Sequence, residues 1–165
     1  MASTISVDTL QGSTTAGTIQ MPPGHVIQVV NGTYSTQTLT TGSSFVDTGL
    51  TASITPKFSS SKVFVTVSQA FSITSGTNAQ YQSNLIIADG SNNLLFGGTS
   101  YDQFRVKEQY AFHWQTNLQM LHSPSTTSSF TYKTRMKAVA GFGTASIGAQ
   151  YGSVPSSITL MEIAQ

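Results

Sequence analysis

The sequence contains no cysteine and few charged residues, since Asp, Glu, Lys and Arg make up 8% of its 165 residues. The absence of cysteine excludes disulfide scaffolds, cysteine-ligated zinc and thiol nucleophiles. The charged share lies far below the roughly 25% of an ordinary soluble domain. The formal net charge of +1 also lacks the basic excess that nucleic-acid-binding domains usually carry. We therefore expect no nucleic-acid partner.

Long hydrophobic runs are missing as well. No segment approaches the roughly 18 consecutive apolar residues that a membrane helix needs, so we expect no membrane insertion. The first residues have neither the basic nor the apolar region of a secretory signal peptide. Export by the secretory route is therefore not expected.

Hydroxyl side chains are abundant: Ser and Thr account for 48 of the 165 residues. They occur within the apolar pattern, where Thr suits β-strands and both residues bond locally in turns. Apolar residues make up 38% of the chain, with nine Phe, six Tyr and one Trp, which excludes global disorder. This composition is common in extracellular and virion β-proteins and unusual for a cytosolic enzyme.

Apolar residues alternate with polar ones along much of the chain, which predicts strands. The longest alternation covers residues 110–121, a second covers 130–138, and Val63, Val65 and Val67 share one face of a third. Asn31-Gly32 predicts a turn that ends a strand over 25–30, and residues 85–88 and 93–96 form a predicted hairpin.

Eight to ten strands without a credible helix predict an all-β fold, an antiparallel β-sandwich with jelly-roll topology. The strands over 110–121 and 130–139 are expected to be central. Residues 25–165 would form this head domain.

Residues 1–24 differ from the rest because they offer little to pack apart from Ile5, Val7 and Leu10 before Ile19. One interpretation is a frayed terminus. The interpretation we favour is an extended N-terminal arm for assembly, which presents Ile5 and Val7 as one face of an added strand on a neighbouring subunit or a larger particle.

Catalytic constellations are absent from the sequence pattern. The six carboxylates form no evident pair for glycoside hydrolysis, and Asp47 and Asp89, each near a glycine, are expected to serve turns. The three histidines lack metal-ligand spacing, and no Gly-x-Ser-x-Gly motif supports a serine nucleophile. We expect a protein that is not an enzyme and holds no metal or cofactor.

Two features could serve recognition. Lys133, Arg135 and Lys137 form a basic stripe on one strand face, which is either a solvated face that deters edge pairing or a contact for an acidic partner or anionic glycan. The loop over 97–104 carries Tyr101, Asp102 and Gln103, which could stack on a sugar ring and bond its hydroxyls or could simply cover the core.

Several linked motifs resemble a known group of proteins. Residues 45–56 read Phe-Val-Asp-Thr-Gly-Leu-Thr-Ala-Ser-Ile-Thr-Pro, residues 59–65 read Ser-Ser-Ser-Lys-Val-Phe-Val, and residues 157–163 read Ser-Ile-Thr-Leu-Met-Glu-Ile. Together with residues 23–30, they resemble small structural proteins of marine and cyanobacterial tailed phages. One departure is His122, which stands where related sequences often carry Asp before Ser-Pro.

The start of the chain adds to this resemblance. Residues 7–11, Val-Asp-Thr-Leu-Gln, are similar to the start of many phage fibre proteins, which attach to the particle by that end. The resemblance implies a virion component. Because the composition suits an exterior protein and no export signal is visible, we expect assembly in the host cytoplasm and release by another route, such as cell lysis by a phage. The partners that the resemblance implies are copies of the chain itself in a homotrimer and other virion proteins that bind the arm.

Two functions are therefore expected from the resemblance. The first is a tail fibre or fibre tip that mediates host attachment, with a host surface glycan as a possible ligand. The alternative is a capsid decoration or cement protein or a capsid-attached fibre, which the shortness of the chain favours. A free lectin or a glycan-cleaving enzyme stays open as a third class.

Overall fold

The computed structural model describes residues 22–74, 81–98, 104–106, 111–139 and 146–165. Within them the chain forms eleven strands and one short 3-10 turn, η1 (Tyr151–Ser153). The strands are β1 (Val26–Tyr34), β2 (Thr38–Thr40), β3 (Val46–Ile54), β4 (Lys62–Thr74), β5 (Tyr81–Asp89), β6 (Leu94–Phe96), β7 (Phe104–Val106), β8 (Ala111–His122), β9 (Phe130–Ala138), β10 (Ser146–Ala149) and β11 (Ser156–Ile163).

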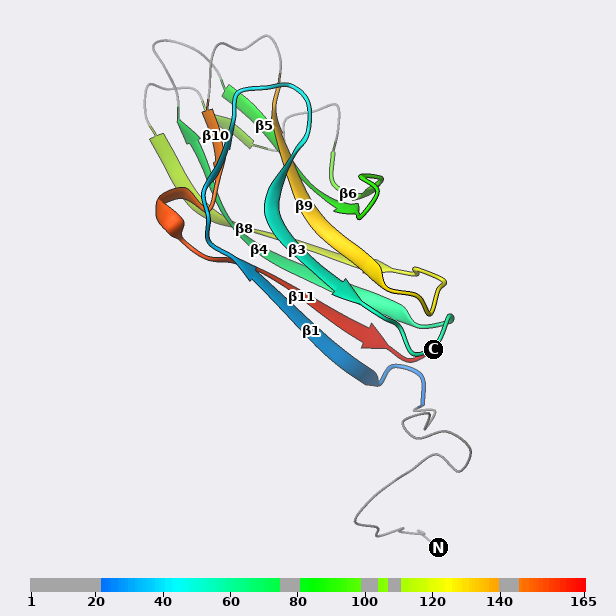
Figure 1. Cartoon of the computed structure of the whole chain (residues 1–165). Coiled ribbons are helices and arrows are strands. Elements are labelled where there is room, and N and C mark those ends of the chain that lie inside the picture. The colour runs from blue at the N-terminus through cyan, green and yellow to red at the C-terminus, as the bar shows by residue number, and fades with distance from the viewer. Residues whose placement is uncertain (1–21, 75–80, 99–103, 107–110, 140–145) are drawn as a thin grey trace, which may run out of the picture.

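The strands form two antiparallel sheets that pack face to face (Figure 1). Sheet A contains β1, β11, β4 and β8, with β2 and β10 alongside; sheet B contains β3, β9, β5, β6 and β7. The main pairs are nested along the chain: β1 with β11, β3 with β9, β4 with β8, and β5 with β6 and β7. A long hairpin rolled into two sheets in this way is a jelly roll, so the predicted fold class is confirmed.

The period-two patterns place the core as predicted. Val63, Val65 and Val67 are fully buried on β4, and Tyr132 and Met136 are fully buried on β9. Alternate residues of both sheets therefore face each other across the sandwich, as this architecture requires. The predicted hairpin over 85–96 is also present, with Asp89 accepting hydrogen bonds from the backbone of Ser91 and Asn93 in its turn.

A buried polar network crosses the core and joins the two sheets. Gln69 of β4 bonds Ser156 of β11 (2.8 Å) and accepts from Thr134 of β9 (2.9 Å). Thr134 also bonds Thr48 of β3, and the amide of Gln150 lies against the same group. Because buried polar atoms are costly unless they are bonded, this network favours one mutual arrangement of the sheets and of the segment after β10.

Three sequence expectations are wrong. Asn31-Gly32 is not a turn, because β1 continues to Tyr34: Asn31 bonds Thr159 on the adjacent strand (2.9 Å). A Cβ at Gly32 would collide with the backbone oxygen of Thr51, so this glycine permits close packing of β1 on β3. The strand over 111–122 is not central, since β8 pairs only with β4 in the described part of the chain.

The third wrong expectation is a turn at Asp47, because this residue lies within β3. A bulge sets residues 48–50 opposite a single residue of β9. Gly49 takes a left-handed φ of 89° there, and a Cβ on it would collide with the ring of Tyr34. The Asp-Thr-Gly motif therefore marks a β-bulge and not a turn. Both features favour glycine, which is why the sequence pattern is ambiguous.

Candidate functional site

The outer face of sheet A carries an apolar row that crosses four strands. The register places Val29 of β1 opposite Met161 of β11, Met161 opposite Phe64 of β4, and Phe64 opposite Leu121 of β8. All four side chains alternate with core residues and therefore point outward. Adjacent strands lie about 4.8 Å apart, so the row runs about 14 Å across the sheet.

The apolar row is open to solvent. Val29 is 58% exposed and Leu121 is 54% exposed, while Phe64 and Met161 between them are half-buried. Val26, 51% exposed, lies at the same end of the sheet opposite Ile163. These outward apolar residues stand together, unlike the single exposed apolar residues that any protein surface carries.

The next two rows of the same face are polar but uncharged. They consist of Asn31, Thr159, Thr66 and Gln119, then Thr33, Ser157, Ser68 and Asn117. Lys62 is the only charged residue at the described outward positions of β1, β11, β4 and β8. The face therefore combines apolar contact area with very little charge.

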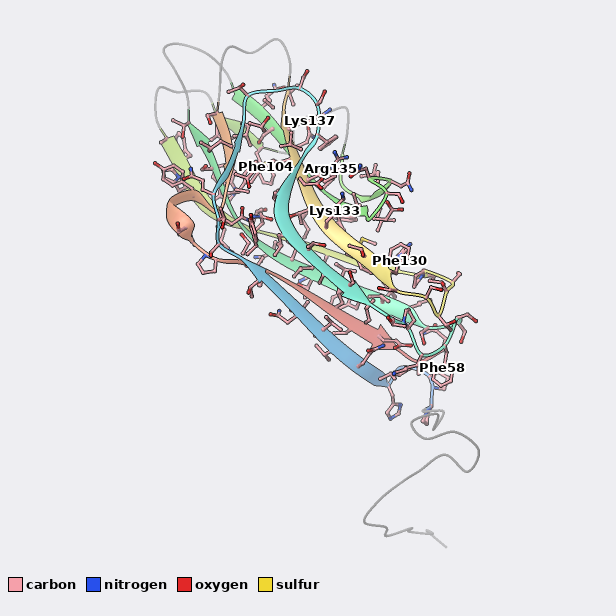
Figure 2. The ribbon with its side chains drawn as sticks, in the orientation of Figure 1. Phe58, Phe104, Phe130, Lys133, Arg135 and Lys137 are labelled. Atoms are coloured by element: carbon pink, nitrogen blue, oxygen red, sulfur yellow. The ribbon has the colours of Figure 1, made fainter. Side chains whose placement is uncertain are left out.

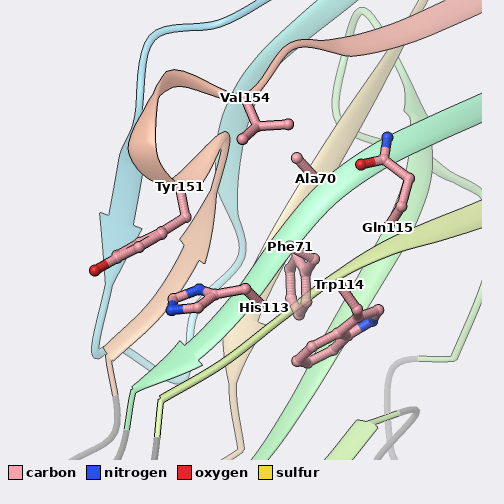
Figure 3. Close-up of a pocket in the computed structure, with 7 residues that line it drawn as sticks. All are labelled: Ala70, Phe71, His113, Trp114, Gln115, Tyr151 and Val154. Carbon is pink, nitrogen blue, oxygen red and sulfur yellow. The ribbon is translucent and has the colours of Figure 1, made fainter.

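A small hollow lies beyond these rows, between β8 and η1. Ala70 lies between Val154 and Gln115, with Tyr151 and His113 on the far side from Gln115 (Figure 3). Its volume is about 210 Å³. The rings of His113 and Tyr151 stack with centroids 3.9 Å apart, so a strand and the 3-10 turn are held together at its rim.

The predicted basic stripe follows β9 on the outer face of sheet B (Figure 2). Lys133 and Arg135 both bind Asp47, with N–O distances of 2.9 and 2.7 Å. Their side chains are only 15% and 17% exposed. Two of the three cations are therefore already paired within the fold.

This pairing affects the carboxylate. Burial acts to raise the pKa of Asp47, but the hydrogen bonds and charges of Lys133 and Arg135 outweigh it and hold the pKa below its usual value of 3.8. Lys137 lies 4.8 Å from the centre of the Phe45 ring, within cation–π range. Lys133, Arg135 and Lys137 of β9 thus hold the start of β3 and the residue before it against β9.

A second hollow, of about 350 Å³, lies beside the Asp47–Lys133 pair. Its polar groups are mostly bonded already: Thr51 donates to the Tyr132 carbonyl (3.0 Å), and Thr131 bonds Ser53 (2.7 Å). It therefore offers fewer free donors and acceptors than its size suggests.

Other predicted site residues are not tested by the structure. Ile5, Val7 and Leu10 of the arm, and Tyr101, Asp102 and Gln103 of the loop, lie outside the described residues. The assembly role of the former and the recognition role of the latter stay predictions.

The structure does locate His122, whose Nδ1 lies 2.9 Å from the buried hydroxyl of Tyr132. This contact joins the end of β8 to β9 of the opposite sheet. Burial lowers the pKa of His122, and the charge of Asp89 opposes that effect. The contact gives this residue a structural role.

The described ranges contain no group of three potential metal ligands. None of the helices there is long and apolar enough to cross a membrane.

The apolar row and the hollow beside η1 were missed by sequence reasoning. The one available signal was Phe64, an apolar residue on the otherwise polar side of its strand. Its neighbours could not be identified because Val29, Met161 and Leu121 belong to strands far apart in the chain.

No protein-family model matches the sequence. None of the curated proteins matches it either.

Among solved structures, the chain is similar to the VP2 protein of infectious bursal disease virus. A VP2 mutant in derived particles matches with 9% identity and a TM-score of 0.39, over 83% of this chain and 36% of that one. The structure of the virus Gt strain matches with 12% identity and a TM-score of 0.38, over 99% and 43%. The chain thus spans less than half of these proteins.

Proposed function

We propose that this chain is a structural protein of a virus particle, a tail-fibre or fibre-tip component that assembles with copies of itself and mediates attachment to the host surface. The observation that carries the assembly part is the apolar row on a nearly uncharged sheet face. The resemblance of several motifs to those of phage structural proteins supports the virion location.

This face is suited to self-association for two physical reasons. Covering the row removes apolar surface from water, which stabilises by about 25 cal/mol for each Å² buried. Two copies that meet through it also bring few like charges together, because Lys62 is the only charged residue at the outward positions of its four main strands in the described chain. Like charges brought face to face would oppose such pairing.

Light scattering during gel filtration tests the assembly claim. The wild-type chain should run as an oligomer of the 17.5 kDa subunit, and the resemblance to phage fibre proteins implies a trimer. The double variant Val29→Thr/Leu121→Thr should dissociate, since both residues are exposed and Thr preserves strand preference. The control Leu94→Thr changes a comparably exposed leucine on sheet B and should leave the mass unchanged. A monomeric wild type would contradict the proposal.

A cell-binding assay separates attachment from capsid decoration. Purified protein should bind host cells and reduce adsorption of the particle that carries it. An oligomer that fails to bind cells would contradict the attachment role and favour a decoration or cement protein, because assembly alone serves that function equally well.

A further inference from the structure

The hollow beside η1 has free polar groups around an apolar floor. Ala70, which is buried, and Val154, which is 50% exposed, contribute apolar side chains to its lining. Gln115 donates its amide N–H to Ser68 (2.9 Å), and its amide oxygen has no protein partner within the described ranges. Within the same ranges, the ring nitrogens of His113 and the hydroxyl of Tyr151 also have no protein hydrogen-bond partner.

These free groups distinguish the hollow from the larger one on sheet B. In that hollow, Thr51, Thr131, Asp47 and Lys133 are bonded to other protein groups. A ligand there would compete with these internal bonds, whereas a ligand beside η1 would meet unused donors and acceptors. The smaller hollow is therefore the better binding site.

The segment that forms the rim has unusual backbone geometry. Gln150 and Ser153, neither of them glycine, have left-handed φ values of 52° and 63°, and Gly152 between them also has a φ of 63°. Left-handed conformations are unfavourable for residues with a Cβ and persist where surrounding structure holds them. Such strain is often found at functional sites.

A buried anchor holds this rim. The side chain of Gln150 is fully buried. In the amide orientation that satisfies both ends, it donates to the Thr48 carbonyl (3.0 Å) and accepts from Gln69 (2.6 Å). The network that joins the two sheets thus also fixes Tyr151, the next residue, over the outer face of sheet A.

We propose that this hollow binds one neutral sugar ring. A pyranose presents an apolar C–H face, which fits Ala70 and Val154, and hydroxyls at its edge, which fit Gln115, His113 and Tyr151. The lining contains no Asp, Glu, Lys or Arg, so an uncharged sugar fits better than an acidic one. The volume of about 210 Å³ is below the roughly 300 Å³ at which drug-sized sites begin, which fits a single ring.

This inference rests on the proposed attachment role and names its ligand class, a neutral terminal sugar of a host surface glycan. A single ring binds weakly, but several copies in one oligomer can engage several glycans together. On the outer face of sheet A, two polar rows separate the apolar row from the hollow.

Isothermal titration calorimetry provides the readout, because the ring of Trp114 packs against Phe71 and Phe104 and not into the hollow. Saturable heat should be measured when the full-length protein is titrated with the methyl glycosides of glucose, galactose and mannose. At least one of the three should bind, and glucuronate, the charged analogue of glucose, should bind more weakly than the methyl glucoside.

Gln115 and Gln119, which lie on the same face of β8, provide a matched pair of variants. Gln115→Met removes the free amide of the hollow and should weaken binding about tenfold, whereas Gln119→Met, in a polar row outside it, should change binding less than about twofold. Ala70→Val, which fills the floor, should also abolish binding. Circular dichroism and light scattering confirm that each variant retains its fold and mass.

Binding of none of the neutral glycosides, or equal binding by the wild type, Gln115→Met and Ala70→Val, would overturn the proposed site. If the oligomer still bound host cells, the site would be wrong while the proposed function stood. If the sugar bound in the hollow but the protein neither assembled nor bound cells, the proposed function would be wrong and the site would stand.

Discussion

The outer faces of the two sheets differ in how they use charge. On sheet B, Lys133 and Arg135 are mostly buried against Asp47, so two of the most conspicuous charges of the sequence already share a carboxylate partner within the fold. On sheet A, the described outward positions of the four main strands include one charged residue, and the apolar row lies open. A cluster of cations in a sequence is therefore weak evidence for an acidic partner, and the uncharged face is the better candidate for assembly.

The largest effect is expected from the bulge that positions Asp47 on sheet B. Gly49→Ala should destabilise the protein by about 3 kcal/mol or more, because the new Cβ meets the Tyr34 ring at a left-handed φ. Gly24→Ala is the control, since Gly24 has the same φ of 89° with no atom within 4 Å of the added carbon, and should cost about 1 kcal/mol. Equal losses in urea unfolding would show that the bulge does not depend on this packing.

A lysine placed on each face tests the comparison directly. Gln119→Lys puts a charge in the row next to the apolar one, and we expect about a hundredfold weaker self-association. Ser53→Lys places the same charge at an exposed position of β3 on sheet B and should leave association unchanged. Analytical ultracentrifugation measures both. If Ser53→Lys dissociates the oligomer and Gln119→Lys does not, the assembly face has been assigned to the wrong sheet.

The smallest effect is expected from the ion pairs of sheet B. Asp47→Asn should lower the free energy of unfolding at pH 7 by no more than about 1 kcal/mol, because the carboxylate is half exposed and screened by water. Since its pKa is lower in the folded state than its usual value of 3.8, its stabilisation is present above that value and is lost as the pH falls through the folded pKa.

The acid unfolding curves of both proteins measure this effect. Between about pH 4.5 and pH 2 the wild type should lose more stability than Asp47→Asn. Parallel losses would mean that the ion pairs contribute nothing. Association should be the same for both proteins at pH 7.

Much of the fold could be predicted from the sequence, because burial of one sheet face imposes a period-two pattern. Val63, Val65, Val67, Tyr132 and Met136 are inward-facing as that pattern requires. Gly32 and Gly49 could not be interpreted in this way: a turn, a bulge and a close backbone approach all favour glycine, and only the packing of Thr51 and Tyr34 distinguishes them.

The candidate sites could be predicted only in part. The basic stripe was evident because its residues share one strand, but its partner Asp47 lies 86 residues from Lys133. The apolar row and the hollow depend on the register of β1, β4, β8 and β11 and on the path of η1. That information resides in long-range pairing, which local sequence patterns do not encode.

The most direct test of the central claim is a cryo-EM map of the intact particle that contains this chain. The account predicts symmetric copies at the tail whose apolar rows on sheet A cover one another, with Val29, Phe64, Leu121 and Met161 in the contacts and the hollow beside η1 left open. Copies whose sheet A faces lie open to solvent while sheet B forms the contacts would contradict it.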